Sequence, residues 1–261
     1  MTDRRAWPLA LLALSLALAA GDARAQDDQR HPAERYRLRL QYRHYMPDLT
    51  GDTRKGADDS GFVDFNDDLG FAQETTFDAR GYIQFSAGKK LRLSYTALDY
   101  AGDQPAPKTF TYGGNRYEIG TQVQSSVKGG YYAADIEWDL VKKPQGFLGL
   151  VVGAKAIDVD TLVFDVQDNV REVDTYRIVV PVLGIAGRWY AGKFSLEGEF
   201  TGLTVGSRGH MYDADTTARF HLSDRLALQG GYRWLRLEAN DDDQEVNFKL
   251  VGWQVGIELS L

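Results

Sequence analysis

The end of the chain constrains its fold more than any other stretch. Residues 245–261 read EVNFKLVGWQVGIELSL, and every second residue from Val251 to Leu261 is hydrophobic, whereas the residues between them are glycine, glutamine, glutamate or serine. Successive side chains of a β-strand point to opposite faces. A period of two therefore predicts a strand that separates an apolar environment from a polar one.

Similar segments recur along the chain. Alternation is clear in residues 35–46, 77–85, 91–96, 132–140, 194–200, 212–221 and 226–234, and residues 146–166 and 170–190 are apolar at both parities. With the last segment this makes ten predicted strands, with eight or twelve as alternatives. Short connections (87–90, 141–146, 190–193, 222–225) mostly alternate with longer ones (47–75, 101–120, 205–211, 239–244), which is the pattern of a transmembrane β-barrel.

The first residues predict export. Arg4 and Arg5 precede an apolar run, and the small residues around Ala25 suit cleavage after that position, so residues 1–25 read as a signal peptide. Residues 26–34 are polar and are predicted to form a disordered segment. No later stretch has the roughly 20 apolar residues of a membrane helix, so a membrane-spanning chain of this kind has to be a barrel.

The final strand also resembles a known signal. It carries a polar residue, a glycine, a hydrophobic residue and a hydrophobic last residue: Gln254, Gly256, Leu259 and Leu261. This arrangement resembles the C-terminal assembly signal of bacterial outer-membrane β-barrels. The chain departs from that pattern because it ends in Leu instead of Phe or Trp. The resemblance implies an antiparallel up-and-down transmembrane β-barrel over residues 35–261. It also implies insertion into the bacterial outer membrane by the barrel assembly machinery, with membrane lipid and lipopolysaccharide as partners.

Composition narrows the chemistry. The chain has no cysteine, which excludes a disulfide scaffold, a cysteine metal site and a thiol nucleophile. Its net charge of −7 becomes −8 without residues 1–25. Nucleic-acid binding would need a basic patch with interleaved aromatic residues, and the sequence has none. The acidic stretches 64–68 and 240–245 lack the spacing of an EF-hand. We therefore predict no cofactor, no metal site and no nucleic-acid partner, and the sequence leaves the oligomeric state open.

The polar faces of the predicted strands carry charges of both signs in nearly equal number, and strands predicted to be neighbours often carry opposite signs. Such residues can pair across a ladder, and an unpaired charge in a lumen of low dielectric is costly. A barrel of ten strands also lies near the size that side chains fill. We predict a charge-filled lumen formed by Arg35, Arg37, Arg39, Arg80, Arg92, Asp135, Glu137, Asp139, Glu197, Glu199, Arg219, Arg233 and Glu258. A soluble sandwich or lipocalin-like barrel, with its apolar face inward, is the alternative.

Three functions follow as hypotheses. The first is a non-enzymatic barrel that supports the outer membrane or presents surface loops to a partner or to lipopolysaccharide. The second is a narrow channel for small solutes, and the third is a barrel hydrolase, either an omptin-like protease or a lipid A modifying enzyme. His210 and Asp213 are weak catalytic candidates because a histidine near a carboxylate can act as a general base. The omptin motif itself is absent, so no catalytic residue is assigned. The hydrophobic residues in 62–71 predict that part of the first long loop folds over the barrel mouth.

Overall fold

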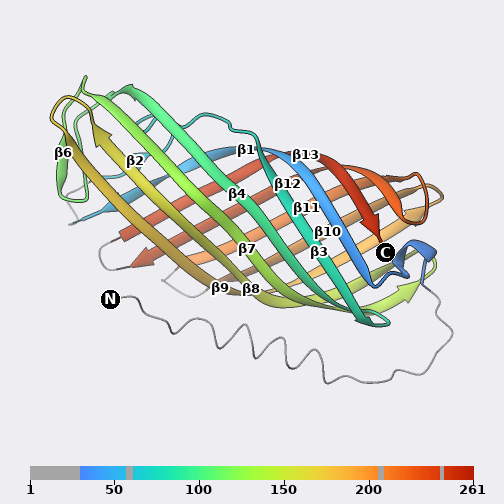
Figure 1. The fold of residues 1–261 in the computed structure, drawn as a ribbon. Coiled ribbons are helices and arrows are strands. Elements are labelled where there is room, and N and C mark those ends of the chain that lie inside the picture. The colour runs from blue at the N-terminus through green and yellow to red at the C-terminus, as the bar shows by residue number, and fades with distance from the viewer. Residues whose placement is uncertain (1–29, 57–60, 205–208, 242–243) are drawn as a thin grey trace.

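The computed structural model describes residues 30–56, 61–204, 209–241 and 244–261 as a closed β-barrel (Figure 1). The predicted signal peptide, residues 26–29 and residues 205–208 and 242–243 lie outside the described residues. Within those residues ten antiparallel strands form the wall: β1 (Leu38–Lys55), β3 (Thr76–Ser86), β4 (Lys89–Pro105), β7 (Gln122–Lys143), β8 (Gly146–Asp165), β9 (Val170–Ala191), β10 (Phe194–Thr204), β11 (Gly209–His221), β12 (Leu226–Asp241) and β13 (Gln244–Ser260).

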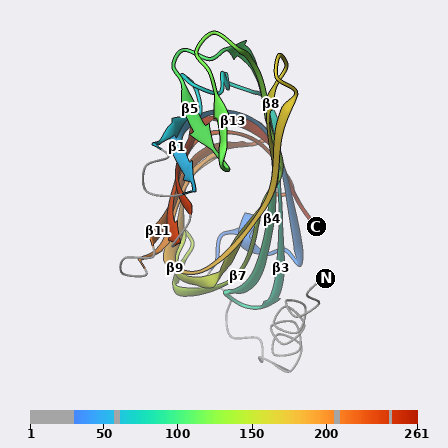
Figure 2. The ribbon, with the colours of Figure 1, turned by 90° about the vertical axis from the view of Figure 1, so that its left-hand side faces the viewer.

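The first and last strands close the barrel. Each wall strand pairs with its neighbour along the chain, and β13 returns to pair with β1 from Arg39↔Ser260 to Lys55↔Gln244. Figure 2 shows the resulting ring of strands in a view along the barrel. The backbone of Leu261 continues this seam, because its N–H donates to Leu38 at 2.7 Å and its carbonyl accepts from Arg37 at 2.8 Å. The prediction of an all-β, up-and-down barrel of ten strands is confirmed.

Short turns gather at one end of the barrel and longer connections at the other (Figure 1). The turn between β3 and β4 contains Gly88 with φ +80°, and the turn between β9 and β10 contains Gly192 with φ +60°. This left-handed backbone region costs glycine little. The end with the short turns also holds the first residues of β1 and the last residues of β13. We call it the periplasmic end, following the usual arrangement of such barrels, and we call the other end the outer end.

Several wall strands run further than the sequence predicted. β1 continues to Lys55 and β4 to Pro105, within segments predicted as loops 47–75 and 101–120. The extra residues carry the barrel beyond its apolar outer belt. Three smaller strands lie at the outer end: β2 (Val63–Asp64) pairs with the top of β1, and β5 (Phe110–Tyr112) pairs with β6 (Asn115–Tyr117). Phe65, Leu69 and Phe71 pack inward between these elements, so the first long loop folds over the mouth as predicted.

The outer face carries a belt of exposed hydrophobic side chains. Leu196 is 49% exposed, Ile185 55% and Val255 51%, although all three lie in the middle of paired strands. An apolar surface of this extent on a barrel is the lipid-facing band of an outer-membrane protein. Among the described residues no helix has the length and apolar character needed to cross a membrane.

Above the belt, the two faces of the wall exchange character. On the lower part of β12, Arg233 points inward and Trp234 outward; two residues later Leu235 points inward and Arg236 outward. The same exchange occurs on β4, where Arg92 is buried below and Leu98 is buried above, next to the exposed Asp99. The lumen is therefore polar within the belt and apolar above it.

Candidate functional site

The polar part of the lumen is filled by paired charges. Asp78 of β3 is fully buried and pairs with Arg43 on the adjacent β1, and Lys90 of β4 lies 2.7 Å from Glu137 on the adjacent β7. We call this set the ion-pair plug; its members are Glu34, Arg39, Arg43, Asp78, Arg80, Lys90, Arg92, Glu137, Asp139, Lys155, Arg188, Glu197, Glu199, Asp213, Asp215, Arg219, Arg233 and Glu258.

Several pairs in the plug cross the lumen instead of joining neighbouring strands. Arg233 of β12 lies 3.0 Å from Asp78 of β3, in addition to its 2.8 Å pair with Asp213 on the adjacent β11. Arg80 of β3 lies 2.8 Å from Asp215 of β11. Such ties connect opposite walls, so they fill the cross-section of the barrel as well as stabilising adjacent strands.

Neutral side chains complete the hydrogen bonding of the plug. The hydroxyl of Tyr131 donates to Asp213 at 2.8 Å, and the amide of Gln254 donates to Asp215 at 3.0 Å. Additional hydrogen bonds of this kind help to offset the cost of removing a carboxylate from water. Gln254, predicted as part of the assembly signal, is 1% exposed, and its partner inside the lumen is Asp215.

The periplasmic end of the lumen is capped by the segment before β1. Residues 26–34 were predicted to be disordered, yet Pro32–Glu34 form the 3-10 helix η1, and Glu34 is 2% exposed. Its carboxylate lies 3.2 Å from Arg39 and 3.5 Å from Arg188. Burial alone would raise the pKa of Glu34, but Arg39, Lys90 and Arg188 outweigh it and hold that pKa at about 2. The prediction failed because it judged the segment by its polarity and could not see cationic partners from β1, β4 and β9.

Most of the residues predicted to line the lumen lie there, and two do not. Arg39, Arg80, Arg92, Asp135, Glu137, Asp139, Glu197, Arg219, Arg233 and Glu258 are buried, and Glu199 pairs with Arg92. Arg35 and Arg37 are exposed, because β1 begins only at Leu38 and both residues precede it at the periplasmic end. Asp135 lies opposite Arg92 in the β4–β7 ladder, and Lys155 of β8 pairs with Asp213 at 2.7 Å.

Six further plug residues lie on the polar faces of predicted strands: Arg43, Asp78, Lys155, Arg188, Asp213 and Asp215. Two plug residues were missed by the sequence analysis. Lys90 was assigned to a turn, although it has the same parity as Arg92 and belongs to β4. Extending the predicted strand by one residue would have found it. Glu34 had no comparable signal, because it lies in a non-repetitive segment and its contacts come from strands distant in the sequence.

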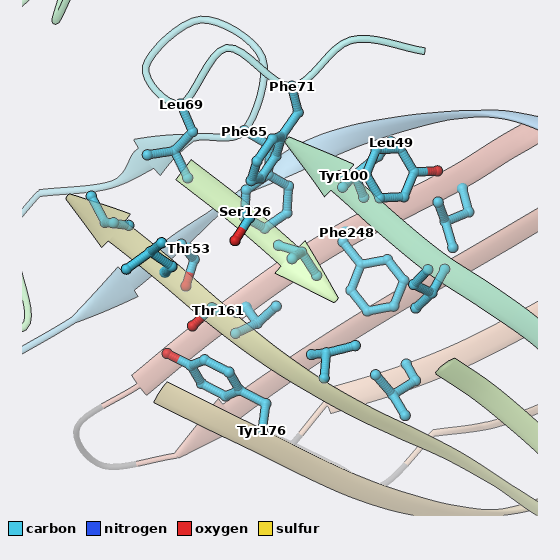
Figure 3. A pocket seen from close by; sticks show the side chains of 18 of the residues that line it. Leu49, Thr53, Phe65, Leu69, Phe71, Tyr100, Ser126, Thr161, Tyr176 and Phe248 are labelled. Carbon is cyan, nitrogen blue, oxygen red and sulfur yellow. The ribbon is translucent and has the colours of Figure 1, made fainter. Parts of the chain in front are cut away.

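A partly open apolar pocket lies above the plug, within the outer end (Figure 3). It has a volume of about 90 Å³, and β1, β4, β5, β7, β8, β9 and β13 contribute to it together with the first long loop. Residues that line it include Leu49, Thr53, Phe65, Leu69, Phe71, Tyr100, Ser126, Thr161, Tyr176 and Phe248. An empty apolar space of this size lacks packing worth about 2 kcal/mol, at roughly 24 cal/mol per Å³.

The weak catalytic candidates are not brought together. His210 and Asp213 lie on opposite faces of β11: His210 is on the outer face, 3.6 Å from Glu238, and Asp213 is inside the plug. Asp99, another rim carboxylate, is exposed on β4. Ser195 and His221 do form a 2.8 Å hydrogen bond, but both are buried at the periplasmic end. Neither residue lines the apolar pocket of the outer end. Nucleophilic catalysis needs a base-activated hydroxyl that a substrate can reach.

The acidic stretch 64–68 serves the fold of its own loop. Asp64 accepts hydrogen bonds from the backbone of Asn66 and Asp67, both at 2.8 Å, and Asp68 pairs with Lys108 at 2.8 Å. In the stretch 240–245, Asp242 and Asp243 lie outside the described residues. Among the residues that the structure describes, no group of three or more histidine or carboxylate side chains is placed to hold a metal ion.

Comparisons with known proteins identify the fold. No protein-family model and no curated protein matches the chain. Among solved structures, the outer membrane protease OmpT of Escherichia coli matches with a TM-score of 0.60 at 10% identity, over 86% of this chain and 96% of that one. OprG of Pseudomonas aeruginosa matches at 11% identity over 90% and 99% of the two chains, with a TM-score of 0.37. At such identities the likeness concerns the fold alone: the chain has the fold of bacterial outer-membrane β-barrels.

Proposed function

We propose that the protein is a non-conducting, non-enzymatic barrel of the outer membrane that holds a structured outer end at the cell surface. The observation that carries this proposal is the ion-pair plug, which ties opposite walls together across the lumen. Cleavage of the signal peptide after Ala25 and insertion by the barrel assembly machinery, through the final strand, belong to the same proposal.

The plug supports a closed lumen on energetic grounds. Arg92 and Glu199 pair across the lumen, and the space between Arg80, Lys155 and their neighbours is only about 10 Å³. A water molecule needs roughly 10–15 Å³, so this space takes about one water molecule. A hydrated ion could pass only if buried pairs separated, and leaving a buried charge without its partner costs about 3–5 kcal/mol.

The outer end supports display at the surface. Its first loop, β5 and β6 pack against the strand tops around a buried hydrophobic cluster that includes Phe110 and Tyr117. Its rim carries acidic residues, with Asp52 and Asp64 opposite each other on β1 and β2. An acidic surface favours a cationic partner and disfavours direct contact with the phosphates of lipopolysaccharide.

Conductance of the purified barrel in planar bilayers tests the proposal. The wild type should give no steady open steps in concentrated potassium chloride. The double variant Arg92→Ala/Glu199→Ala removes one tie that crosses the lumen, so it should admit a small current. Arg177→Ala, which removes an ion pair 2.8 Å long on the outer surface, is the matched control and should remain silent. Steady wild-type steps that change size in the double variant would instead establish the narrow channel.

A further inference from the structure

The pocket at the outer end has the character of a ligand site. It is lined by twenty residues, and among them there is no aspartate, glutamate, lysine, arginine or histidine. Leu98, Ile157 and Val159 are among its buried hydrophobic side chains. Ligand pockets are typically concave and mostly apolar, with few polar groups. This pocket differs in that respect from the lumen directly below it.

Several hydroxyl groups around the pocket have partners within the protein, whereas the buried hydroxyl of Tyr100 has no hydrogen-bond partner among the described residues. Thr53 donates to the carbonyl of Glu245 at 3.1 Å, and the hydroxyls of Tyr112 and Tyr176 lie 3.0 Å apart. Desolvation, with Tyr176 close by, raises the pKa of Tyr112 above its ordinary value, so this phenol stays neutral at physiological pH. The lining therefore offers hydrocarbon contacts and no free charge.

The nearest charges disfavour an anion. Lys55, at the top of β1, pairs with both Glu172 and Asp174, so its charge is already compensated. Glu245 at the same rim is likewise compensated, because it pairs with Arg54 at 2.6 Å, whereas Asp52 and Asp64 lie opposite each other on β1 and β2 and add negative charge. An anionic ligand such as a fatty acid carboxylate or a phosphate would meet like charge there, whereas an uncharged ligand would not.

The barrel wall is incomplete on one side of the pocket. β10 pairs with β9 only up to Gly202↔Leu183, so in the described residues the part of β9 from Val170 to Val182 pairs with β8 alone. Tyr176 and Ile178 lie on this part of β9 and line the pocket, whereas β10, β11 and β12 contribute no lining residue. On this side the pocket is therefore bounded by the upper part of β9 and not by β10, β11 or β12.

We propose that this pocket binds a small uncharged hydrophobic molecule, of the size of one aromatic ring or a short alkyl chain. The volume of about 90 Å³ sets that size: an engineered cavity of about 150 Å³, lined like this one by Leu, Ile and Phe, stays dry and binds benzene. The ion-pair plug forms the floor, so the molecule is bound and not conducted through the barrel. The proposal goes beyond the proposed function and does not depend on the result of the conductance test.

Fluorine NMR with fluorobenzene as the probe tests this site. The full mature barrel is placed in lipid nanodiscs, because detergent chains would compete for an apolar pocket, and protein-free nanodiscs measure partition into lipid. The wild type should give saturable binding above that background. Val159→Phe fills the pocket from the inner face of β8 and should weaken binding at least tenfold. Val173→Phe, on the exposed outer face of β9, is the matched control and should bind like the wild type.

Two further measurements guard against ambiguous results. Should Val159→Phe fail to fold, as judged by loss of heat-modifiable gel mobility, Val163→Leu adds a single methylene group to the same lining and should weaken binding less. Cyclohexane should displace the probe, and benzoate should not. The proposal is overturned by binding no greater than in empty nanodiscs, by full binding in a folded pocket-filling variant, or by displacement with benzoate as effective as with cyclohexane.

Discussion

Arg233 and Leu235 are two residues apart on the inward face of β12, each 2% exposed, yet the first lies in the ion-pair plug and the second in the hydrophobic cluster of the outer end. The outer face changes in the opposite sense, from Trp234 to Arg236. Below this boundary the outside of the barrel meets lipid, so apolar side chains face outward and charges must pair inside. Above it the outside meets water, and burial of apolar surface again favours a hydrophobic interior.

The two regions therefore stabilise the barrel by different means. In the lower region closure depends on ion pairs such as Arg43–Asp215, at 2.9 Å, which leave little space. In the outer region it depends on side-chain packing around Tyr100 and Phe248, which leaves a pocket of about 90 Å³. The effect of a mutation on stability therefore depends on its height along the strand as well as on the face it occupies.

Exchanging the character of the two β12 residues should have the largest effect. Arg233→Leu leaves the buried Asp78 and Asp213 short of a partner, and we expect a loss of about 3–5 kcal/mol in the free energy of unfolding. Leu235→Arg places a charge without a partner in the outer hydrophobic cluster and should be at least as harmful. Urea unfolding in lipid vesicles measures both.

Leu235→Met is the control for that exchange, because it conserves volume and should cost less than about 1.5 kcal/mol. If Arg233→Leu cost no more than this control, the lower lumen would not depend on paired charge, and the contrast between the regions would be lost.

Charges added to the outer face should separate the regions next. Val255, in the lower belt, is 51% exposed and Val173, on the upper part of β9, is 54% exposed. Val255→Arg puts a charge against lipid and should destabilise the barrel by about 2–4 kcal/mol. Val173→Arg faces water and should change stability by no more than about 0.5 kcal/mol. Equal costs in the same vesicle unfolding assay would mean that the boundary of the lipid belt is misplaced.

The smallest expected effect is local and concerns the periplasmic end of the plug. The pKa of Glu34 is about 2, below the ordinary glutamate value of about 4.3. A lowered pKa stabilises the folded segment above the ordinary value, and that stabilisation is lost as the pH falls from about 4.3 toward 2. The hydrogen-exchange protection factors of residues 30–37, taken against the intrinsic exchange rate at each pH, should therefore be high at pH 7 and should fall over this acidic range.

Glu34→Gln should show low protection factors at every pH, because the neutral amide pairs weakly with Arg39 and Lys90. Arg37→Gln, at an exposed position, should retain the wild-type profile. A wild-type segment as well protected at pH 2 as at pH 7 would show that the carboxylate does not hold η1 in place.

Much of the fold could be predicted because its signal is local. Val255, Ile257 and Leu259 alternate with polar residues in the sequence itself, and the short turns follow from residues such as Gly88 and Gly192. The outward limits of the strands could not be read in the same way. Above the belt the hydrophobic residues change parity, and this change made the continuations of β1 and β4 resemble loops.

Alternation and turns are properties of neighbouring residues, so they already show in the sequence that this chain forms strands with unlike faces, that their number is even, and that charges of both signs share one face. Which charges pair depends on the closed barrel, since Arg233 and Asp78 meet across the lumen and lie 155 residues apart. The tertiary structure also decided that η1 enters the lumen and that the outer end encloses a pocket. Both depend on side chains that meet only after the barrel has closed, where the cost of burying a charge or leaving a space is set by every strand around it.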